Sequence, residues 1–444
     1  MSAGEDGGRS AVTPLPPSDA CVVGATGELD AALRAVMTDP ARPLASLAVL
    51  TVEDGLVTYT GSFGSRRISA ESPAGDLPAG PHTKFRVASI SKLVTATSVL
   101  QQVERGHVDL DADVSAYLGF TLRNPSFPDA LVTARMLLSH TSSLRDGESY
   151  TFPAPERLSD HLAAGDTKAG DRSHWATPTA AAGDVGPGRY FCYQNLNYGV
   201  LATILEAVSG ERFDAYVREH VLVPLGCEAS FDVRDFSPQA LQDLAVLYRK
   251  DDGEGTWDEA GPWRAQIDDL RGVRPPEPEG AAAYVPGTNA TWQSPQGGLR
   301  ISAWDLSKVM RMFLDRGVFH GARILQPETV DLMFTPQWVY DGLHPNGDTY
   351  GDLMLCYGLG PQIMTDTLGD RLLAGKAVTM AGHFGDANGL LSAMMMDFAG
   401  RRGFVYLIGG VGADPERQPG SYSSMSRWEE EIVTAVFRYD LRRD

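Results

Sequence analysis

Apolar runs of strand length occur in two separate parts of the chain. Residues 46–64 carry two such runs around Asp54-Gly55, a dipeptide that favours a tight turn, so this stretch predicts a β-hairpin. Residues 389–397 and 403–410 are further apolar runs, separated by the turn-like FAGRR, and predict two more strands. Strands near both ends with a helical middle indicate one sheet built from both parts of the chain.

Helical spacing of apolar residues marks three other segments. Residues 28–37 predict a short helix, and residues 426–441 predict a helix that closes the chain. Residues 84–106 predict a central buried helix, because their apolar positions recur at helical spacing and Gly106 stands where a C-cap belongs. Residues 120–290 alternate short helical stretches with long polar loops, which in a compact protein often shape a binding site.

Composition narrows the class of protein. The 444 residues suit two lobes or one large α/β unit, and 43% apolar residues can bury a sizeable core. A net charge of −19 disfavours nucleic acid and anionic membranes as partners. The four cysteines show no CxxC spacing, so we expect reduced, buried thiols. The polar first residues contain no signal peptide, so a cytoplasmic location is expected; a secreted or periplasmic one stays open if a leader was removed.

Ser89 and Lys92 stand three residues apart in SISK, within the predicted central helix. On a helix this spacing places both side chains on one face, one turn apart. Serine needs an adjacent base to act as a nucleophile, and a lysine buried on an apolar face loses hydration, so its pKa falls. Because SxxK is frequent by chance, a capping serine beside a surface lysine is the competing interpretation.

The residues around this pair resemble a known family. Residues 85–118 resemble the nucleophile helix of class C β-lactamases and their penicillin-binding relatives. Residues 131–144, LVTARMLLSHTSSL, resemble the family segment R-x-L-L-x-H-T-S-G-L, with Ser143 where glycine is usual and His140 as a structural residue of the turn. Residues 187–210 begin PGRYFCYQN and resemble the family segment P-G-x-x-F-x-Y-S-N.

The resemblance selects the remaining candidate residues. Tyr193 matches the family tyrosine; a tyrosine beside a lysine ammonium can have a lowered phenol pKa and accept a proton. Asn195 matches the asparagine, whose amide can hold both the lysine and a substrate carbonyl. His383-Phe384-Gly385 stands where β-lactamases carry Lys-Thr-Gly, as in many esterase and peptidase relatives.

Two further positions complete the predicted site. By position, the backbone amide of Asp386 is expected to form the oxyanion hole together with the Ser89 amide, while the small Gly385 lets substrate approach the strand edge. Trp292, just before a Gly-Gly segment, is the aromatic residue chosen as a substrate contact.

The resemblance implies an α/β (α+β) fold, with an antiparallel sheet flanked by helices on both faces and an inserted all-helical subdomain. We expect a disordered arm over 1–27, the α/β sandwich over 28–120 plus 290–444, and the helical subdomain over 121–289. Ser89, Lys92 and Tyr193 are the expected catalytic residues of a serine hydrolase with no metal or organic cofactor, acting on a small-molecule or peptide acyl substrate.

Several functions remain open from the sequence. An esterase or a peptidase acting on D-residues is favoured, because His383 replaces the lysine that would meet a β-lactam carboxylate. An acyltransferase or peptide-cyclising enzyme of the same family, and a β-lactamase, are the alternatives. A ligand-binding or sensor protein that has kept the fold without turnover is the alternative from another class. The oligomeric state is left undetermined.

Overall fold

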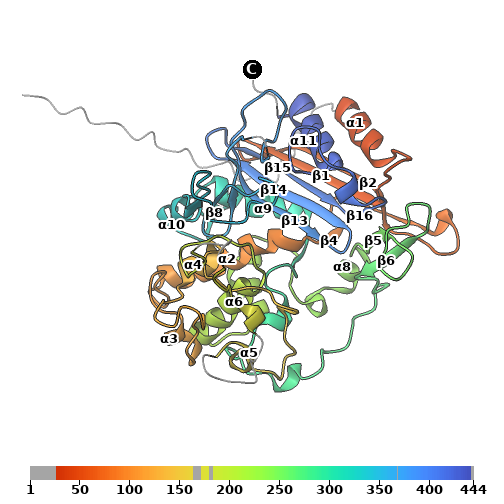
Figure 1. The fold of residues 1–444 in the computed structure, drawn as a ribbon. Coiled ribbons are helices and arrows are strands. Elements are labelled where there is room, and N and C mark those ends of the chain that lie inside the picture. Colours follow the sequence, from red (N-terminus) through yellow and green to blue (C-terminus); the bar gives the residue numbers. More distant parts are fainter. Residues whose placement is uncertain (1–26, 164–171, 180–183, 368, 442–444) are drawn as a thin grey trace, which may run out of the picture.

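A large antiparallel sheet organises the molecule (Figure 1). The computed structural model describes residues 27–163, 172–179, 184–367 and 369–441, so the predicted arm lies outside the described residues except for Gly27. The sheet has nine strands in the order β10-β11-β12-β13-β14-β15-β1-β2-β3. Their bounds are β1 Ser46–Glu53, β2 Leu56–Arg67, β3 Leu77–Pro78, β10 Trp338–Val339, β11 Cys356–Tyr357, β12 Gln362–Ile363, β13 Ala381–Ala387, β14 Leu390–Asp397 and β15 Arg402–Ile408.

The sheet joins the two parts of the chain at β1 and β15. These strands pair antiparallel, with Val49 opposite Tyr406, while β1 also pairs with β2. Asp54 and Gly55 both have positive φ, 47° and 75°, as the tight turn between β1 and β2 requires. The predicted hairpin, the two later strands and their union in one sheet are therefore confirmed.

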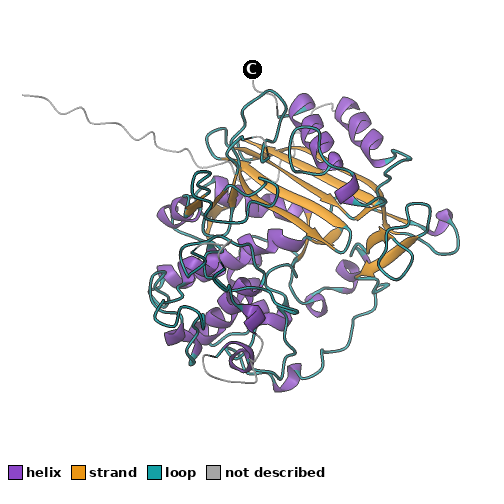
Figure 2. Ribbon diagram, in the orientation of Figure 1, coloured by secondary structure: helices purple, strands orange, loops and turns teal. Residues whose placement is uncertain are grey.

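Helices cover both faces of this sheet, as Figure 2 shows. Alternate residues of each strand point to opposite faces. On one face, the odd-numbered β1 residues Leu47 and Val49 share a core with α1 (Gly27–Met37) and α11 (Arg427–Tyr439). On the other face, Ala48 and Leu50 share a core with α2 (Ser91–Glu104) and α9 (Ala303–Leu314). The helices predicted at 28–37 and 426–441 are thereby confirmed.

Below the sheet, α3, α4 and α7 pack around α2 and α6, whereas α8 lies beside β5 (Leu247–Lys250) and β6 (Trp263–Ile267) and α10 lies beside α9 (Figure 1). Both α2 and α6 are buried along most of their length, so they form the core of this helical region. The bounds of these helices are α3 Ser115–Leu118, α4 Ala134–Leu138, α5 Leu158–Leu162, α6 Leu196–Ser209, α7 Phe213–Val217, α8 Pro238–Gln242 and α10 Pro327–Met333.

Two details differ from the sequence expectations. Residues 84–86 are not helical: they form β4 (Lys84–Arg86), which pairs with β7 (Arg300–Ser302), so the central helix begins only at Ser91. The inserted region is not all-helical either, since it contains β5 (Leu247–Lys250) and β6 (Trp263–Ile267). In both places a strand far along the chain pairs with the segment and forms hydrogen bonds with its backbone groups. For β5 this partner strand is β16 (Gly410–Val411).

Smaller features complete the description. Two short strands, β8 (Val318–Phe319) and β9 (Ala322–Arg323), form a separate hairpin. Cys192, Cys227 and Cys356 are free and buried, as expected, while Cys21 lies outside the described residues. Within the described ranges, every helix is too short or too polar to cross a membrane.

Candidate active site

Ser89 lies in a short 3-10 turn, Ala88–Ile90, that leads from β4 into α2. Ala88 has a positive φ of 47°, a conformation that costs a residue with a Cβ atom about 1–2 kcal/mol. The turn is held by its neighbours: the Val87 amide donates to the Leu299 carbonyl at 2.9 Å, and Ser91 Oγ donates to the Ala88 carbonyl at 2.6 Å. The strained turn therefore presents Ser89 just before α2 begins, whereas the sequence pattern placed it inside the predicted helix.

Lys92 is fully buried one turn further along α2, with three polar contacts at its amine. Nζ lies 3.0 Å from Ser89 Oγ, 2.9 Å from Asn195 Oδ1 and 3.1 Å from the carbonyl oxygen of Gln296. Burial lowers the Lys92 pKa to about 7, against a smaller upward effect of the Asp146 carboxylate. A neutral Lys92 can donate its two hydrogens to the two fixed carbonyl oxygens, which leaves its lone pair directed at the Ser89 hydroxyl.

Asn195 owes its orientation to Asp146, a residue that the sequence reasoning did not single out. Asn195 Nδ2 donates to Asp146 Oδ2 at 3.0 Å, and the Leu196 amide donates to Asp146 Oδ1 at 2.8 Å. The amide oxygen of Asn195 must therefore face Lys92. Asp146 lies two residues after the HTSSL segment, so its place near the recognised motif was the one available signal.

Tyr193 has a pKa opposite in direction to the one expected. Desolvation in the pocket wall raises it well above the usual phenol value, and a hydrogen bond with Ser89 only partly opposes this. The expectation of a lowered pKa is wrong, because desolvation of the buried phenol outweighs the opposing interactions, and the Lys92 amine beside the ring is only about half protonated at pH 7. Tyr193 is thus a neutral phenol that donates a hydrogen bond.

His140 supports this tyrosine. Its ring lies 4.4 Å from the Tyr193 ring, centroid to centroid, and its Nδ1 accepts hydrogen bonds from the Gln194 amide at 3.1 Å and from Asn197 Nδ2 at 3.0 Å. Burial holds the pKa of His140 well below its usual value, so the ring is neutral. The HTSSL and YQN segments therefore meet through His140, which has the structural role expected of it.

His383 is buried on β13 between two tyrosines. Its Nδ1 bonds to the backbone oxygen of Phe384, so Nε2 accepts a hydrogen bond of 2.9 Å from Tyr357 and lies 3.5 Å from the Tyr193 hydroxyl. Burial, followed by the charge of Lys92, lowers the His383 pKa to about 3. His383 is consequently uncharged at neutral pH, unlike the lysine that it replaces in the family motif.

Gly385 brings β13 against the serine turn. A Cβ atom at this position would lie 2.8 Å from the Val87 carbonyl oxygen and 3.1 Å from the Ser89 amide nitrogen, so only glycine allows this approach. The next residue, Asp386, is exposed at the pocket wall. Local desolvation and then the charge of Glu429 raise the Asp386 pKa to about 6, although water at its exposed side screens part of this effect.

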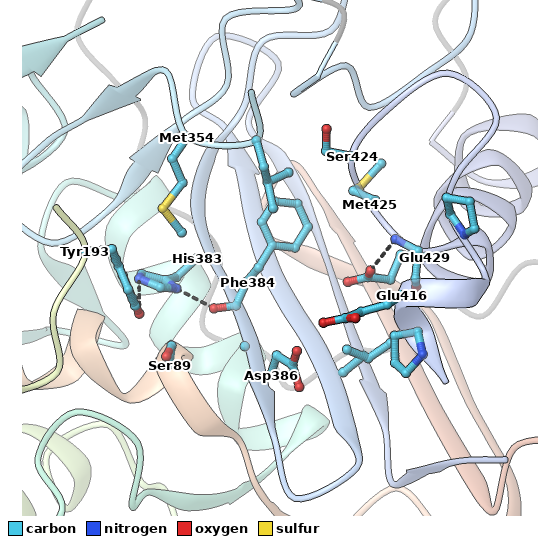
Figure 3. A pocket seen from close by; sticks show the side chains of 16 residues that line it. Ser89, Tyr193, Met354, His383, Phe384, Asp386, Glu416, Ser424, Met425 and Glu429 are labelled. Atoms are coloured by element: carbon cyan, nitrogen blue, oxygen red, sulfur yellow. Dashed lines mark hydrogen bonds between the residues drawn. The ribbon is translucent and has the colours of Figure 1, made fainter. Parts of the chain in front are cut away.

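A pocket of about 550 Å³ opens beside Ser89. Figure 3 shows Ser89, Tyr193 and His383 on one side of it and Glu416 and Glu429 on the other, with Phe384 between them. Its walls are otherwise largely apolar, from side chains such as Met354, Leu391 and Met425, and its described lining contains no lysine or arginine. The pocket therefore favours apolar acyl groups and disfavours a carboxylate near Glu416.

Trp292 does not belong to this pocket. It lines a second cavity, and its ring lies 6.0 Å from the Arg212 guanidinium carbon and 5.3 Å from the Tyr284 ring. The structure thus brings together Ser89, Lys92, Tyr193, Asn195, His383, Gly385 and Asp386, and places Trp292 elsewhere. Across the described ranges, no group of three or more histidine, cysteine or acidic side chains is arranged to hold a metal ion.

This fold and these residues define a serine enzyme of the hydrolase and acyltransferase type. A family model described as Beta-lactamase matches residues 29–423, so the chain belongs to the β-lactamase family. Among curated proteins, it is 28% identical over 305 residues to a monacolin J acid methylbutanoyltransferase of Aspergillus terreus, covering 65% of this chain and 66% of that protein. It is also 28% identical over 201 residues to penicillin-binding protein 4* of Bacillus subtilis, covering 45% of this chain and 41% of that one.

Solved structures support the fold. A penicillin-binding protein homologue from Pyrococcus abyssi superposes with a TM-score of 0.60 at 23% identity, covering 88% of this chain and 75% of that one. The D-amino acid amidase of Ochrobactrum anthropi in complex with D-phenylalanine superposes with a TM-score of 0.60 at 18% identity, covering 92% and 99%. The predicted antiparallel sheet with helices on both faces is therefore confirmed as the fold of this family.

Proposed function

We propose that the protein is a serine hydrolase that forms an acyl-enzyme on Ser89 and cleaves an uncharged ester or amide. The observation that carries the proposal is the contact of 3.0 Å between Lys92 Nζ and Ser89 Oγ, made by a lysine whose pKa is near 7. A lysine in this state is both present as a free base and close enough to take the serine proton.

The reaction follows from these positions. Lys92 takes the proton of Ser89 as Oγ bonds to the carbonyl carbon, and the amides of Ser89 and Asp386 stabilise the oxyanion. The bond to the leaving group then breaks, and the leaving atom receives a proton through the Tyr193 hydroxyl, which Lys92 replenishes. Water, activated by the neutral Lys92, attacks the acyl-enzyme and returns Ser89 to its starting state.

The charges of the side chains that line the pocket favour some classes of candidate substrate over others. Neutral His383 offers no cation to a substrate carboxylate, and Glu416 and Glu429 line the same pocket. Both features favour neutral or amine-bearing acyl groups over the anionic β-lactams. An esterase, or a peptidase acting on D-residues, therefore fits better than a β-lactamase.

Intact-protein mass spectrometry tests this proposal. Wild type and Ser89→Ala would each be incubated with a p-nitrophenyl ester, a D-amino-acid amide, a cephalosporin and a serine-reactive phosphonate. We expect a phosphonate adduct and ester or amide turnover in wild type only, with little reaction of the cephalosporin. Wild type that resists the phosphonate would contradict the hydrolase proposal and favour the ligand-binding or sensor alternative.

Acyl transfer is the second candidate, favoured by the names of two relatives. Besides the methylbutanoyltransferase, an acyltransferase of Monascus pilosus is 27% identical over 326 residues, covering 70% of each chain. Transfer differs from hydrolysis only in the acceptor that attacks the acyl-enzyme. Adding alcohols or amines to the ester assay separates the two, because a transferase releases p-nitrophenol faster with acceptor and forms a new ester or amide.

A further inference from the structure

A second cavity, of about 270 Å³, is lined by Arg86, Trp292 and Ser294, among other residues. Its walls include apolar side chains of Phe231, Val233 and Trp292 and a proline-rich loop that contributes Pro276. The cavity also contains charged side chains, and these decide what it can bind.

Arg86 connects this cavity with the serine turn. It lies on β4, three residues before Ser89, and its Nε donates to the carbonyl oxygen of Gly297 at 3.1 Å. The carbonyl oxygen of the preceding residue, Gln296, accepts the hydrogen bond from Lys92. Adjacent carbonyl groups thus hold the lysine of the site and the arginine of the second cavity.

The other charges in the cavity are already paired. Arg300 binds Asp268 at 2.8 Å, and Asp214 binds Arg212 at 2.6 Å. Arg234 donates from Nε to Asp232 at 3.0 Å. The two carboxylates that line the cavity, Asp214 and Asp232, are therefore both engaged by arginines.

Arg86 is the exception among the charged side chains of this cavity. In the described part of the chain no carboxylate forms an ion pair with it, and its side chain donates a hydrogen bond to the Gly297 carbonyl oxygen. Burial and then the nearby Arg300 lower the pKa of Arg86 to about 10, against a smaller upward effect of Asp268, the partner of Arg300, so the guanidinium remains charged at neutral pH. A mostly buried cation with no carboxylate bonded directly to it favours the binding of an anion, and a guanidinium matches the two oxygens of a carboxylate.

We propose that this cavity binds an organic carboxylate with an apolar body, in which the carboxylate pairs with Arg86 and the body packs against Trp292 and Phe231. The size of the cavity suits a small acid such as 3-phenylpropanoate rather than a peptide or a nucleotide. The inference does not depend on catalysis at Ser89, because it concerns binding at a separate cavity.

The test compares 3-phenylpropanoate with 3-phenylpropanamide, which has the same body without the charge. Calorimetric titration of the Ser89→Ala protein excludes turnover, so the result is independent of the proposed function. We expect the acid to bind at least about tenfold more tightly than the amide, and Arg86→Gln to remove this preference. Thermal unfolding of Arg86→Gln verifies that the variant is folded.

A second pair of variants leaves Arg86 in place. Pro276 is exposed on the loop at the cavity, so substitution there leaves the core intact. Pro276→Asp places a negative charge at the cavity and is expected to weaken acid binding about tenfold, whereas Pro276→Ala serves as the matched control. Equal affinities of acid and amide, or acid binding unchanged in both Arg86→Gln and Pro276→Asp, would overturn the proposal. A third variant, Glu416→Gln, tests whether the acid binds instead in the pocket of Ser89. If the acid bound more tightly to Glu416→Gln, and as tightly to Arg86→Gln as to the parent protein, the proposal would also be overturned.

Discussion

Asp146 accepts a hydrogen bond of 3.0 Å from Nδ2 of Asn195, and this bond fixes which end of the Asn195 amide faces Lys92. The amide oxygen consequently lies 2.9 Å from Lys92 Nζ. The same carboxylate raises the pKa of Lys92 against the larger downward effect of burial. Asp146 therefore acts on the proposed base in two ways, by orienting its hydrogen-bond partner and by supplying a negative charge.

Asp146→Asn separates these two effects. Loss of the charge lowers the Lys92 pKa further, so the acid limb of the pH profile should move about one pH unit lower. Loss of the defined amide orientation should slow the labelling of Ser89 about tenfold at the plateau. The rate of phosphonate labelling as a function of pH measures both quantities. Asp146→Glu, which keeps the charge, should leave the limb in place; an unmoved limb in Asp146→Asn contradicts the electrostatic role.

Gly385→Ala tests the close approach of β13 to the serine turn. The added Cβ atom would lie 2.8 Å from the Val87 carbonyl oxygen, closer than real Cβ atoms come, so the turn that carries Ser89 must shift. We expect phosphonate labelling of Ser89 to slow at least about a hundredfold, since small displacements of reacting groups have effects of this size. Gly80→Ala is the matched control, because a Cβ atom there meets nothing within 4 Å. Equal labelling rates in the two variants would show that the turn tolerates the displacement.

Ser143 stands at the position where the family segment has glycine, and its backbone explains that preference. Its φ is +67°, and its Oγ accepts a hydrogen bond of 3.1 Å from Asn124 Nδ2. Ser143→Val combines a β-branched side chain with positive φ and loses that acceptor, so we expect about 2–3 kcal/mol lower stability in urea unfolding. Ser143→Gly loses the bond but relieves the strain, and should change stability by less than about 1 kcal/mol.

Local patterns were sufficient for much of this structure. The hairpin at Asp54-Gly55 and the helix that follows Ser89 each depend on residues close together in sequence, so their patterns predict them directly. The motif register likewise selected Tyr193 and His383 from several nearby aromatic residues and histidines.

The predictions that were wrong concern features that depend on residues far along the chain. Residues 84–86 were predicted to be helical but form a strand, because their backbone groups pair with those of residues 300–302. The direction of the Tyr193 pKa depends on the burial of the phenol by segments that are distant in sequence, which a motif does not reveal. Trp292 was chosen for its place beside a glycine pair, yet its side chain lines the second cavity.

The pH dependence of acylation follows from the Lys92 pKa of about 7. Only the neutral amine has a lone pair for the Ser89 proton, so the labelling rate should fall about tenfold per pH unit below that value and reach a plateau above it. Lys92→Arg should abolish labelling at every pH, because a guanidinium stays protonated. A profile that is flat through neutral pH would contradict Lys92 as the base.

The same pKa shift predicts how stability changes with pH. The folded state holds Lys92 at a pKa of about 7, whereas the unfolded chain holds a lysine near 10.5, so between these values the unfolded state binds more protons. Stability contributed by this group therefore rises with pH across that window, and the full penalty of burying the charge is present below it. Lys92→Met removes the titration, so the free energy of unfolding of wild type minus that of Lys92→Met should increase by about 2 kcal/mol from about pH 7 to about pH 9. Urea unfolding of both proteins across this range measures the difference, and parallel curves would show that Lys92 keeps its ordinary pKa in the folded protein.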